Sequence, residues 1–303
     1  MNAMKFAVPL LVAAVAYGPS QGWAVPILGA DLASFAILGG GGVTIGGTGS
    51  VINGSIGAYP TTSITGVIPT NFNITGGTVQ NGGAVAGNAQ NPQLTDAINA
   101  LAGTAPGTPE TALGGLTLGP GVYTSAAAMD LTGTLTLDGQ GNANAFWVFL
   151  VGSSLTTASN SVVNVINTGP GAGLFWVMGQ SASLGSNSVF EGNILANQSI
   201  TLDTNVTIGC GRVLTQVASV TLAGTDTISR GCAGTGEEGS NGLSGSGLDF
   251  VGGKVVIAAG QPGAGTVVSV PGATVPEPGI LLLFGFGLVG LLFTSRKRLF
   301  PAA

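Results

Sequence analysis

The chain has 303 residues, of which 45% are hydrophobic and 6% are charged, with no histidine and a formal net charge of −5. The charged fraction lies far below the ~25% usual for soluble domains, and the scarce charges form no basic patch for phosphate binding, which excludes nucleic acid as a partner. An enzyme is disfavoured as well, because general-base and nucleophilic catalysis draw on His, Cys, Lys or paired carboxylates.

The first 24 residues have the organisation of a signal peptide. Lys5 precedes an apolar run over residues 6–17, and Gly22 and Ala24 place small residues where a signal peptidase cleaves. We therefore expect signal peptidase to remove residues 1–24 and the mature chain to begin near Val25. The alternative, a membrane anchor, is disfavoured because the apolar run is too short to span a bilayer.

One segment is helical in character. The sequence NPQLTDAINALAG begins at Asn91 with an N-cap residue, places Pro92 at the first helical position and ends at Gly103. The preceding residues AVAGNAQ extend the helix, with Pro92 at a kink. We predict one long helix over about residues 84–102.

Ser/Thr-rich units that alternate hydroxyl and apolar residues follow the helix. They begin at Thr134, Ser154, Ser181, Ser199 and Ser219, so the starts lie 20, 27, 18 and 20 residues apart. Alternation sends the apolar side chains inward and the hydroxyl side chains outward. Near-regular units of this length predict a β-solenoid in which each coil packs on its neighbours. The alternative, a β-sandwich, predicts no recurrent face.

The outward residues of these units would form a flat lattice of hydroxyl and methyl groups. Positions i and i+2 lie ~6.6 Å apart along a strand and neighbouring coils ~4.8 Å apart, close to the oxygen spacings on ice. The alternative is an ordinary solvated strand face. The predicted outward residues are Thr134, Thr136, Ser154, Thr156, Ser181, Ser183, Ser199, Thr201, Ser219 and Thr221.

The two cysteines, Cys210 and Cys232, lie 22 residues apart, which is about one coil. Adjacent coils bring two Cα atoms within disulfide range, and an exported protein matures in an oxidising compartment. We predict a disulfide, with two free buried thiols as the alternative. Asp138 and Asp203 occupy equivalent repeat positions, but other units lack the carboxylate, so we expect no metal site.

The C-terminal part contains a linker and a sorting tail. Residues 233–274 are rich in Gly and Ser, which predicts a flexible linker with one short strand at about residues 254–258. Residues 275–303 contain Pro276, Glu277 and Pro278, an apolar run over residues 279–295 and a basic cluster over residues 296–298. The basic cluster predicts a cytoplasmic end, which leaves the body outside.

This tail resembles the PEP-CTERM sorting signal of Gram-negative bacteria. The resemblance implies transient anchoring in the inner membrane by a short transmembrane helix, processing by an exosortase-type enzyme, and delivery to the cell surface or the extracellular matrix. A plain C-terminal anchor is the alternative.

The body, residues 25–232, resembles the microbial ice-binding protein family. The stretches that carry the resemblance are LGADLASFAILGGGGVTI (28–45), IGAYP (56–60), LGPGVYTSAAAMDLTGTLTLDGQGNANAFWVF (118–149), GSSLTTASNSVV (152–163), LFWVMGQSASLGSNSVFEGNILANQSITL (174–202) and GRVL (211–214). It implies a mostly β fold, a discontinuous right-handed β-solenoid of triangular cross-section with one long α-helix alongside and a cap region at about residues 50–80. It also implies adsorption to ice through one flat face, without catalysis or a cofactor.

The family's ice-binding motif, T-A/G-x-T/N, matches the segment TASN from Thr157 to Asn160, and the related segments end at Asn187 and Asn205. The resemblance therefore adds these four residues to the predicted ice-binding set. We expect an exported, monomeric antifreeze-type protein that inhibits ice growth or recrystallisation. The alternative is a structural or adhesive protein that binds extracellular polysaccharide, which the few aromatic residues outside the core disfavour.

Overall fold

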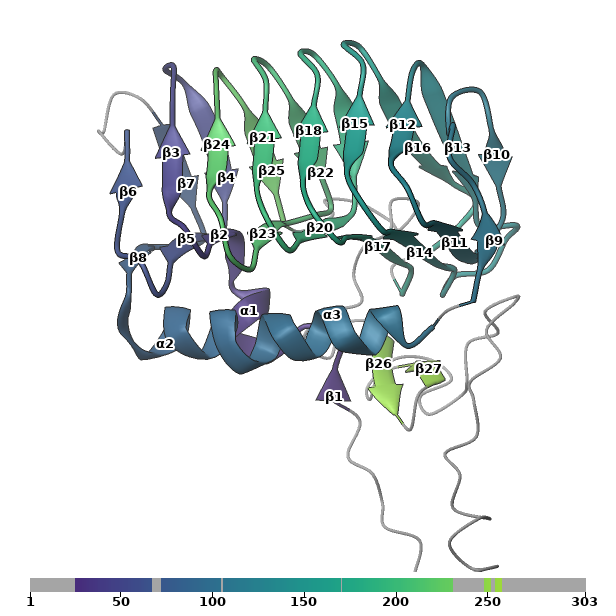
Figure 1. The fold of residues 1–303 in the computed structure, drawn as a ribbon, viewed down its shortest axis with the longest axis horizontal. Coiled ribbons are helices and arrows are strands. Elements are labelled where there is room, and N and C mark those ends of the chain that lie inside the picture. Colours follow the sequence, from purple (N-terminus) through teal and green to yellow (C-terminus); the bar gives the residue numbers. More distant parts are fainter. Residues whose placement is uncertain are drawn as a thin grey trace, which may run out of the picture.

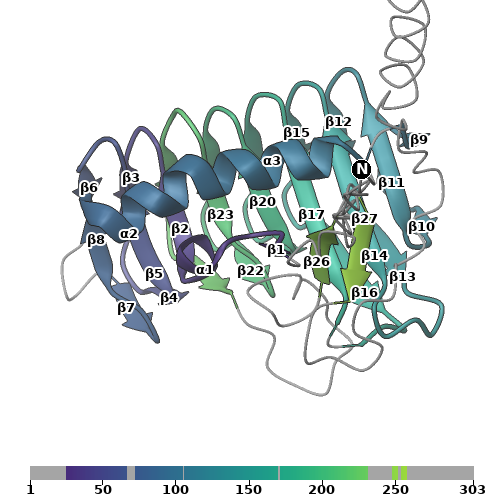
Figure 2. The ribbon, with the colours of Figure 1, turned by 90° about the horizontal axis from the view of Figure 1, so that it is seen from below.

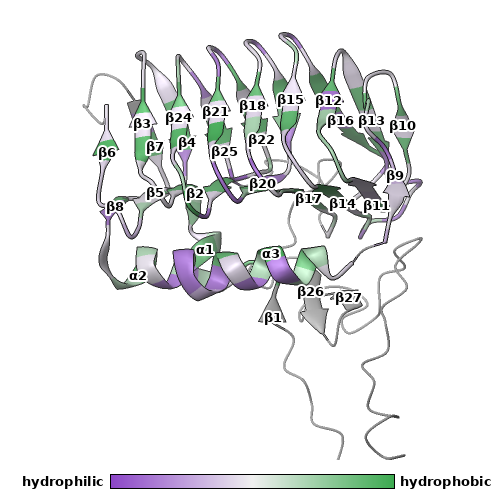
Figure 3. Ribbon diagram, viewed as in Figure 1, coloured by the Kyte–Doolittle hydropathy of each residue, from purple (hydrophilic) through white to green (hydrophobic). Residues whose placement is uncertain are grey.

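Three parallel sheets enclose one apolar core and form a β-solenoid (Figures 1 and 2). The computed structural model describes residues 25–66, 72–104, 106–169, 171–230, 248–251 and 254–257. A complete coil contributes one short strand to each sheet, and the corners between the strands carry polar or glycine residues (Figure 3). The predicted mostly β, solenoid fold is confirmed.

Within each sheet, the strands pair in the following spatial order. The seven-stranded sheet contains β12 (Met129–Leu131), β15 (Leu155–Thr157), β18 (Ala182–Leu184), β21 (Ile200–Leu202), β24 (Val220–Leu222), β3 (Val43–Ile45) and β6 (Ile64–Thr65). The eight-stranded sheet contains β10 (Thr117–Leu118), β13 (Thr134–Asp138), β16 (Val162–Ile166), β19 (Val189–Glu191), β22 (Thr207–Gly209), β25 (Thr227–Ser229), β4 (Ser50–Asn53) and β7 (Phe72–Thr75). The nine-stranded sheet contains β8 (Val79–Asn81), β5 (Ser55–Ala58), β2 (Phe35–Gly39), β23 (Val213–Thr215), β20 (Asn193–Ala196), β17 (Gly173–Met178), β14 (Phe146–Val151), β11 (Gly121–Ser125) and β9 (Thr108–Pro109).

The stack of coils is discontinuous in sequence, as the resemblance implied. Strands late in the chain pair with strands near its beginning, namely β23 with β2, β24 with β3 and β25 with β4. This topology also places the region predicted as a cap, at about residues 50–80. Residues 50–66 and 72–81 contain β4 to β8, which extend all three sheets and form the coils at one end of the stack.

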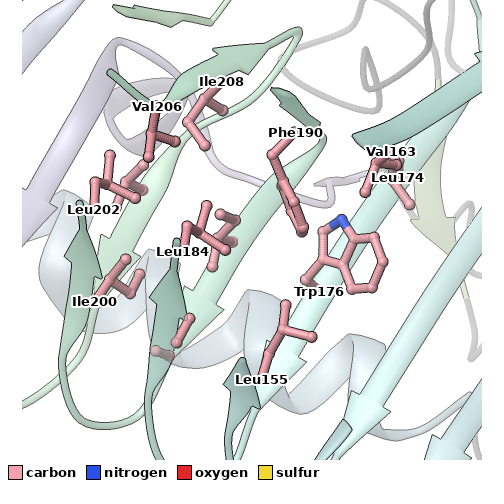
Figure 4. Packing of buried hydrophobic residues seen from close by; sticks show 14 of the residues in the cluster. Leu155, Val163, Leu174, Trp176, Leu184, Phe190, Ile200, Leu202, Val206 and Ile208 are labelled. Carbon is pink, nitrogen blue, oxygen red and sulfur yellow. The ribbon is translucent and has the colours of Figure 1, made fainter. Parts of the chain in front are cut away.

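The inner strands of the nine-stranded sheet are apolar on both faces. Its strands β14 and β17 are almost continuously hydrophobic and have no alternation between buried and exposed positions, as expected for a parallel strand that is covered on both sides. Inside the solenoid, Phe149 stacks on Trp176 with ring centroids 3.9 Å apart and on Tyr123 at 5.2 Å. The core rows continue from coil to coil through residues such as Leu184 and Leu202 (Figure 4).

A helical segment covers the outer face of the nine-stranded sheet (Figures 1 and 2). It consists of α2 (Gly83–Asn88), the π-helical turn η1 (Ala89–Leu94) and α3 (Thr95–Ala102), which confirms the predicted long helix alongside the solenoid. A kink occurs at Asn91, whose φ of −152° and ψ of 117° are not helical and which precedes Pro92. Gln90 holds the helix to the solenoid by donating hydrogen bonds to the carbonyls of Thr215 and Gln216 at 2.9 and 2.8 Å.

Two further elements lie on this helix side. The short helix α1 (Ala30–Ala33) packs Leu32 into the same apolar cluster as the long helical segment. Strand β1 (Val25–Pro26) pairs antiparallel with the hairpin of β26 (Leu248–Val251) and β27 (Lys254–Ile257). The predicted linker therefore contains two strands instead of one, and the described body reaches beyond residue 232.

The remaining predictions on the chain ends fall outside the described residues. This applies to the signal peptide, to the sorting tail with Pro276, Glu277 and Pro278, and to Cys232. Cys210, its predicted partner, is buried, and the disulfide stays a prediction. Within the described ranges, no helix has the length and hydrophobicity needed to cross a bilayer.

Candidate functional site

The outward residues of the seven-stranded sheet form one straight row, which we call the threonine row. Parallel pairing places them directly opposite one another on successive coils. In spatial order the row contains Asp130, Thr156, Ser183, Thr201, Thr221, Thr44 and Thr65. The residues on either side of the row members from Asp130 to Thr44 are buried, as in β21, where Ile200 and Leu202 flank Thr201. Alternation in the strands thus produces the row that the sequence predicted.

A second row, the serine row, runs beside the threonine row at the position two residues earlier. The backbone N–H of the residue that follows each serine donates to the backbone carbonyl of the equivalent residue in the next coil, so the row members lie side by side. The row contains Ser154, Ser181, Ser199 and Ser219 and continues through Gly42 and Ser63. Ser181 and Ser199 are also joined through their hydroxyl groups at 3.0 Å. Both rows together make up the outer surface that we call the seven-strand face.

Asparagines turn the chain at the corner between the seven- and eight-stranded sheets. Asn160, Asn187 and Asn205 have φ values of 61°, 59° and 67°, a left-handed conformation that asparagine tolerates better than most residues. Nδ2 of Asn205 donates a hydrogen bond to Oδ1 of Asn187 at 2.9 Å. These predicted site residues thus lie at the edge of the seven-strand face, where they have a conformational role.

The structure places three of the predicted site residues off the seven-strand face. Thr134 and Thr136 lie in β13 of the eight-stranded sheet, because period-2 alternation looks alike on every wall of a solenoid. Their coil contributes Asp130 to the threonine row instead. Thr157 is 4% exposed, and its Oγ1 accepts a hydrogen bond from the amide of Gly185 at 2.9 Å, so it stabilises the corner from inside.

Two row members, Thr44 and Thr65, were not predicted. They come from the first coils of the chain, which stack after the last Ser/Thr-rich unit. The local signal exists in VTI over residues 43–45, but the Ser/Thr-rich units begin about 90 residues later. Thr44 pairs with Thr221 across this join, and Thr65 donates to the hydroxyl of Thr44 at 3.3 Å in the next coil.

Charge is nearly absent from the threonine row. Asp130, the one ionisable member, lies in the edge strand β12 at the end of the sheet. No group of three or more potential metal ligands occurs among the described residues. The arrangement offers a flat, rigid and neutral array of hydroxyl and methyl groups, suited to contact an ordered surface at many points.

Below the corner, Asp226 is a buried carboxylic acid with 1% of its surface exposed. Its Oδ1 accepts a hydrogen bond from the amide of Val206 at 2.8 Å, whereas its Oδ2 has no partner. Burial, the largest cause, raises the pKa of Asp226 to about 6, against the opposing backbone hydrogen bonds of Val206, Gly224 and Asn205. The folded state therefore favours the protonated acid.

This shift predicts that stability falls as the pH rises. Below the unfolded pKa of about 4, Asp226 is protonated in both the folded and the unfolded protein. Between that pH and about pH 6 it ionises in the unfolded protein but resists ionisation in the folded one, so the free energy of unfolding decreases. A shift of about two pKa units corresponds to roughly 3 kcal/mol. We expect Asp226→Asn to gain stability over the parent between pH 4 and pH 7, measured by urea unfolding. An equal gain in the exposed Asp130→Asn, whose carboxylate does not act on Asp226, would contradict this prediction.

Comparison with known proteins identifies the family. A family model described as ice-binding-like matches residues 37–228, which include most of the solenoid strands. The chain belongs to the ice-binding-like family. A model of the PEP-CTERM protein-sorting motif matches residues 274–298, which confirms the resemblance of the tail to that sorting signal.

Members of the ice-binding-like family from several organisms resemble this chain. An ice-binding protein of Nostoc sp. (strain HG1) is 39% identical over 298 residues, covering 97% of this chain and 96% of the relative. The crystal structure of an ice-binding protein from the Antarctic ascomycete Antarctomyces psychrotrophicus superposes with a TM-score of 0.62 at 34% identity, covering 69% of this chain and 100% of that one. An ice-binding protein from an Antarctic biological consortium has a TM-score of 0.58 at 32% identity, with 67% and 90% covered.

Proposed function

We propose that this protein is a non-catalytic ice-binding protein that adsorbs to ice through the seven-strand face and inhibits ice growth or recrystallisation. The observation that carries the proposal is the threonine row, in which six hydroxyl residues lie in register on consecutive parallel strands. Membership in the ice-binding-like family and the similarity to proteins named for ice binding support it.

The physical basis is pre-organisation. Each hydroxyl or methyl contact with ice is weak, so adsorption requires many contacts whose ordering cost is already met in the free protein. Threonine has few side-chain rotamers, and neighbouring rungs lie ~4.8 Å apart. The hydroxyl pair Thr65–Thr44 restricts the threonine row further, and the pair Ser181–Ser199 restricts the serine row.

Export and retention at the cell surface form the second part of the proposal. The sorting motif at residues 274–298 supports processing by an exosortase-type enzyme, and the predicted signal peptide would direct the body across the membrane. A disulfide between Cys210 and Cys232 would suit an oxidising compartment and close the coil that follows β22. The ice face would then act on ice outside the cell.

The test is a direct measurement on ice. We expect the exported protein, purified after processing, to shape growing ice crystals, to produce thermal hysteresis and to slow recrystallisation. Serum albumin at the same concentration provides the baseline. A purified, folded protein with no effect on ice beyond that baseline would exclude the proposed function and favour adhesion to polysaccharide.

A further inference from the structure

The eight-stranded sheet carries a regular outward row of its own, which we call the β-branched row. Pairing in register aligns one outward residue from each of six consecutive strands. The row contains Thr134, Val162, Val189, Thr207, Thr227 and Val51 and ends at Asn73. All six aligned residues are threonine or valine, two residue types that share a branched Cβ and a methyl group.

Solvation alone does not account for this row. Val189 is 43% exposed and Val51 is 38% exposed, which places them among the few exposed large hydrophobic residues of the described chain. A strand face that only meets liquid water gains no solvation free energy from exposed valine, because exposed apolar surface is unfavourable. The row instead repeats one side-chain shape, since branching at Cβ restricts threonine and valine to similar rotamers.

The lattice and the charge of this surface resemble those of the seven-strand face. Successive members of the β-branched row lie ~4.8 Å apart, and the next outward row lies two residues, ~6.6 Å, further along the strands. That second row includes Thr117, Thr136, Asn164, Ser229, Asn53 and Thr75, with the half-buried Glu191 as its charged member. The β-branched row itself is uncharged, as contact with the neutral lattice of ice requires.

We propose that the outer surface of the eight-stranded sheet, the eight-strand face, is a second ice-contacting surface that acts independently of the seven-strand face. The inference rests on the proposed function. The two faces are different walls of the solenoid that meet at the corner containing Asn187 and Asn205 (Figure 1). They therefore cannot lie on one flat ice plane together. One molecule would contact two differently oriented planes, or two neighbouring crystals at a grain boundary.

The experiment blocks each face separately in the exported protein. Thr207→Tyr places a bulky ring in the middle of the β-branched row, and Thr201→Tyr does the same in the threonine row. Asn99→Tyr, at an exposed position of α3 on the helix side, is the matched control. The double variant completes the set. Fluorescently labelled protein is frozen into a single ice crystal, and both the amount adsorbed and the planes that fluoresce are recorded.

We expect each single variant to keep part of the adsorption, and the double variant to lose at least tenfold relative to Asn99→Tyr. The planes kept by Thr201→Tyr should be those lost by Thr207→Tyr. If Thr201→Tyr alone abolishes adsorption, the second surface is excluded and the proposed function stands. If neither variant differs from Asn99→Tyr, both faces are wrong although the protein adsorbs. A parent that does not adsorb excludes the proposed function itself.

Two further measurements test for misfolding and for self-association. Val189→Lys alters the same row at a well-exposed position. If Thr207→Tyr folds poorly, Val189→Lys takes its place in the test and should show the loss of adsorption expected for Thr207→Tyr. Sedimentation of the parent and of Thr207→Tyr reports the oligomeric state. If the parent is a dimer that Thr207→Tyr converts to a monomer, the β-branched row is an interface between copies and the inference is overturned.

Discussion

Thr201→Tyr is expected to weaken adsorption through the seven-strand face roughly tenfold, which corresponds to ~1.4 kcal/mol of adsorption free energy, and thermal hysteresis should fall with it. Thr201 lies between Ser183 and Thr221 in the middle of the threonine row. A tyrosine ring there stands above the flat surface and separates the neighbouring rungs from the ice. Because the contacts of a rigid face form together, one obstruction affects the whole row and not one residue alone.

Stability should be nearly unaffected, which separates this effect from unfolding. Thr201 is a half-exposed strand residue, and surface substitutions of this kind usually change the free energy of unfolding by less than about 0.5 kcal/mol. Thermal hysteresis and the melting temperature are measured side by side, with Asn99→Tyr as the control. Unchanged hysteresis in Thr201→Tyr would show that the seven-strand face is not the ice-binding surface.

Arg212→Ala is expected to destabilise the fold by roughly 3–5 kcal/mol. Arg212 is 4% exposed and immediately precedes β23, the strand that pairs with β2 across the discontinuity of the solenoid. Its guanidinium donates to the carbonyl of Ala33 at 2.9 and 3.2 Å, to Oδ1 of Asn193 at 3.2 Å and to the carbonyl of Arg230 at 3.3 Å. The alanine variant leaves a cavity in place of the side chain. The carbonyl and amide oxygens that accepted hydrogen bonds from the guanidinium lose this donor.

The charge of Arg212 is retained at neutral pH. Burial, assisted by the neighbouring Arg230, lowers the pKa of Arg212 to about 9, which still lies above 7. Arg230 is less buried and donates to the carbonyls of Ala33 and Gly76. Arg230→Ala should therefore cost less, on the order of 1–2 kcal/mol. Urea unfolding of the three proteins measures the difference, and equal losses in both variants would contradict a special role for Arg212.

Much of the fold could be predicted because solenoid coils repeat a local pattern. Apolar residues such as Ile200 and Leu202 alternate with hydroxyl residues within a single strand, so the direction of each side chain follows from the sequence. The helix was predictable for the same reason, since its proline and apolar stripe are local features, although it begins at Gly83 and Asn91 lies at the kink instead of at an N-cap. The hairpin of β26 and β27 was only half predicted, because its pairing with β1 joins segments more than 200 residues apart.

The sequence by itself determined which side chains point inward and which outward, because alternation is a property of each strand. Only the tertiary structure decided which strands are neighbours. The units are unequal in length and the chain returns to its first coils after its last, so long-range parallel pairing brings Thr44 and Thr65 into the threonine row and assigns Thr134 and Thr136 to another wall. It also places Thr157 inside the corner. Backbone hydrogen bonds between coils, which no local pattern specifies, select the residues that share a face.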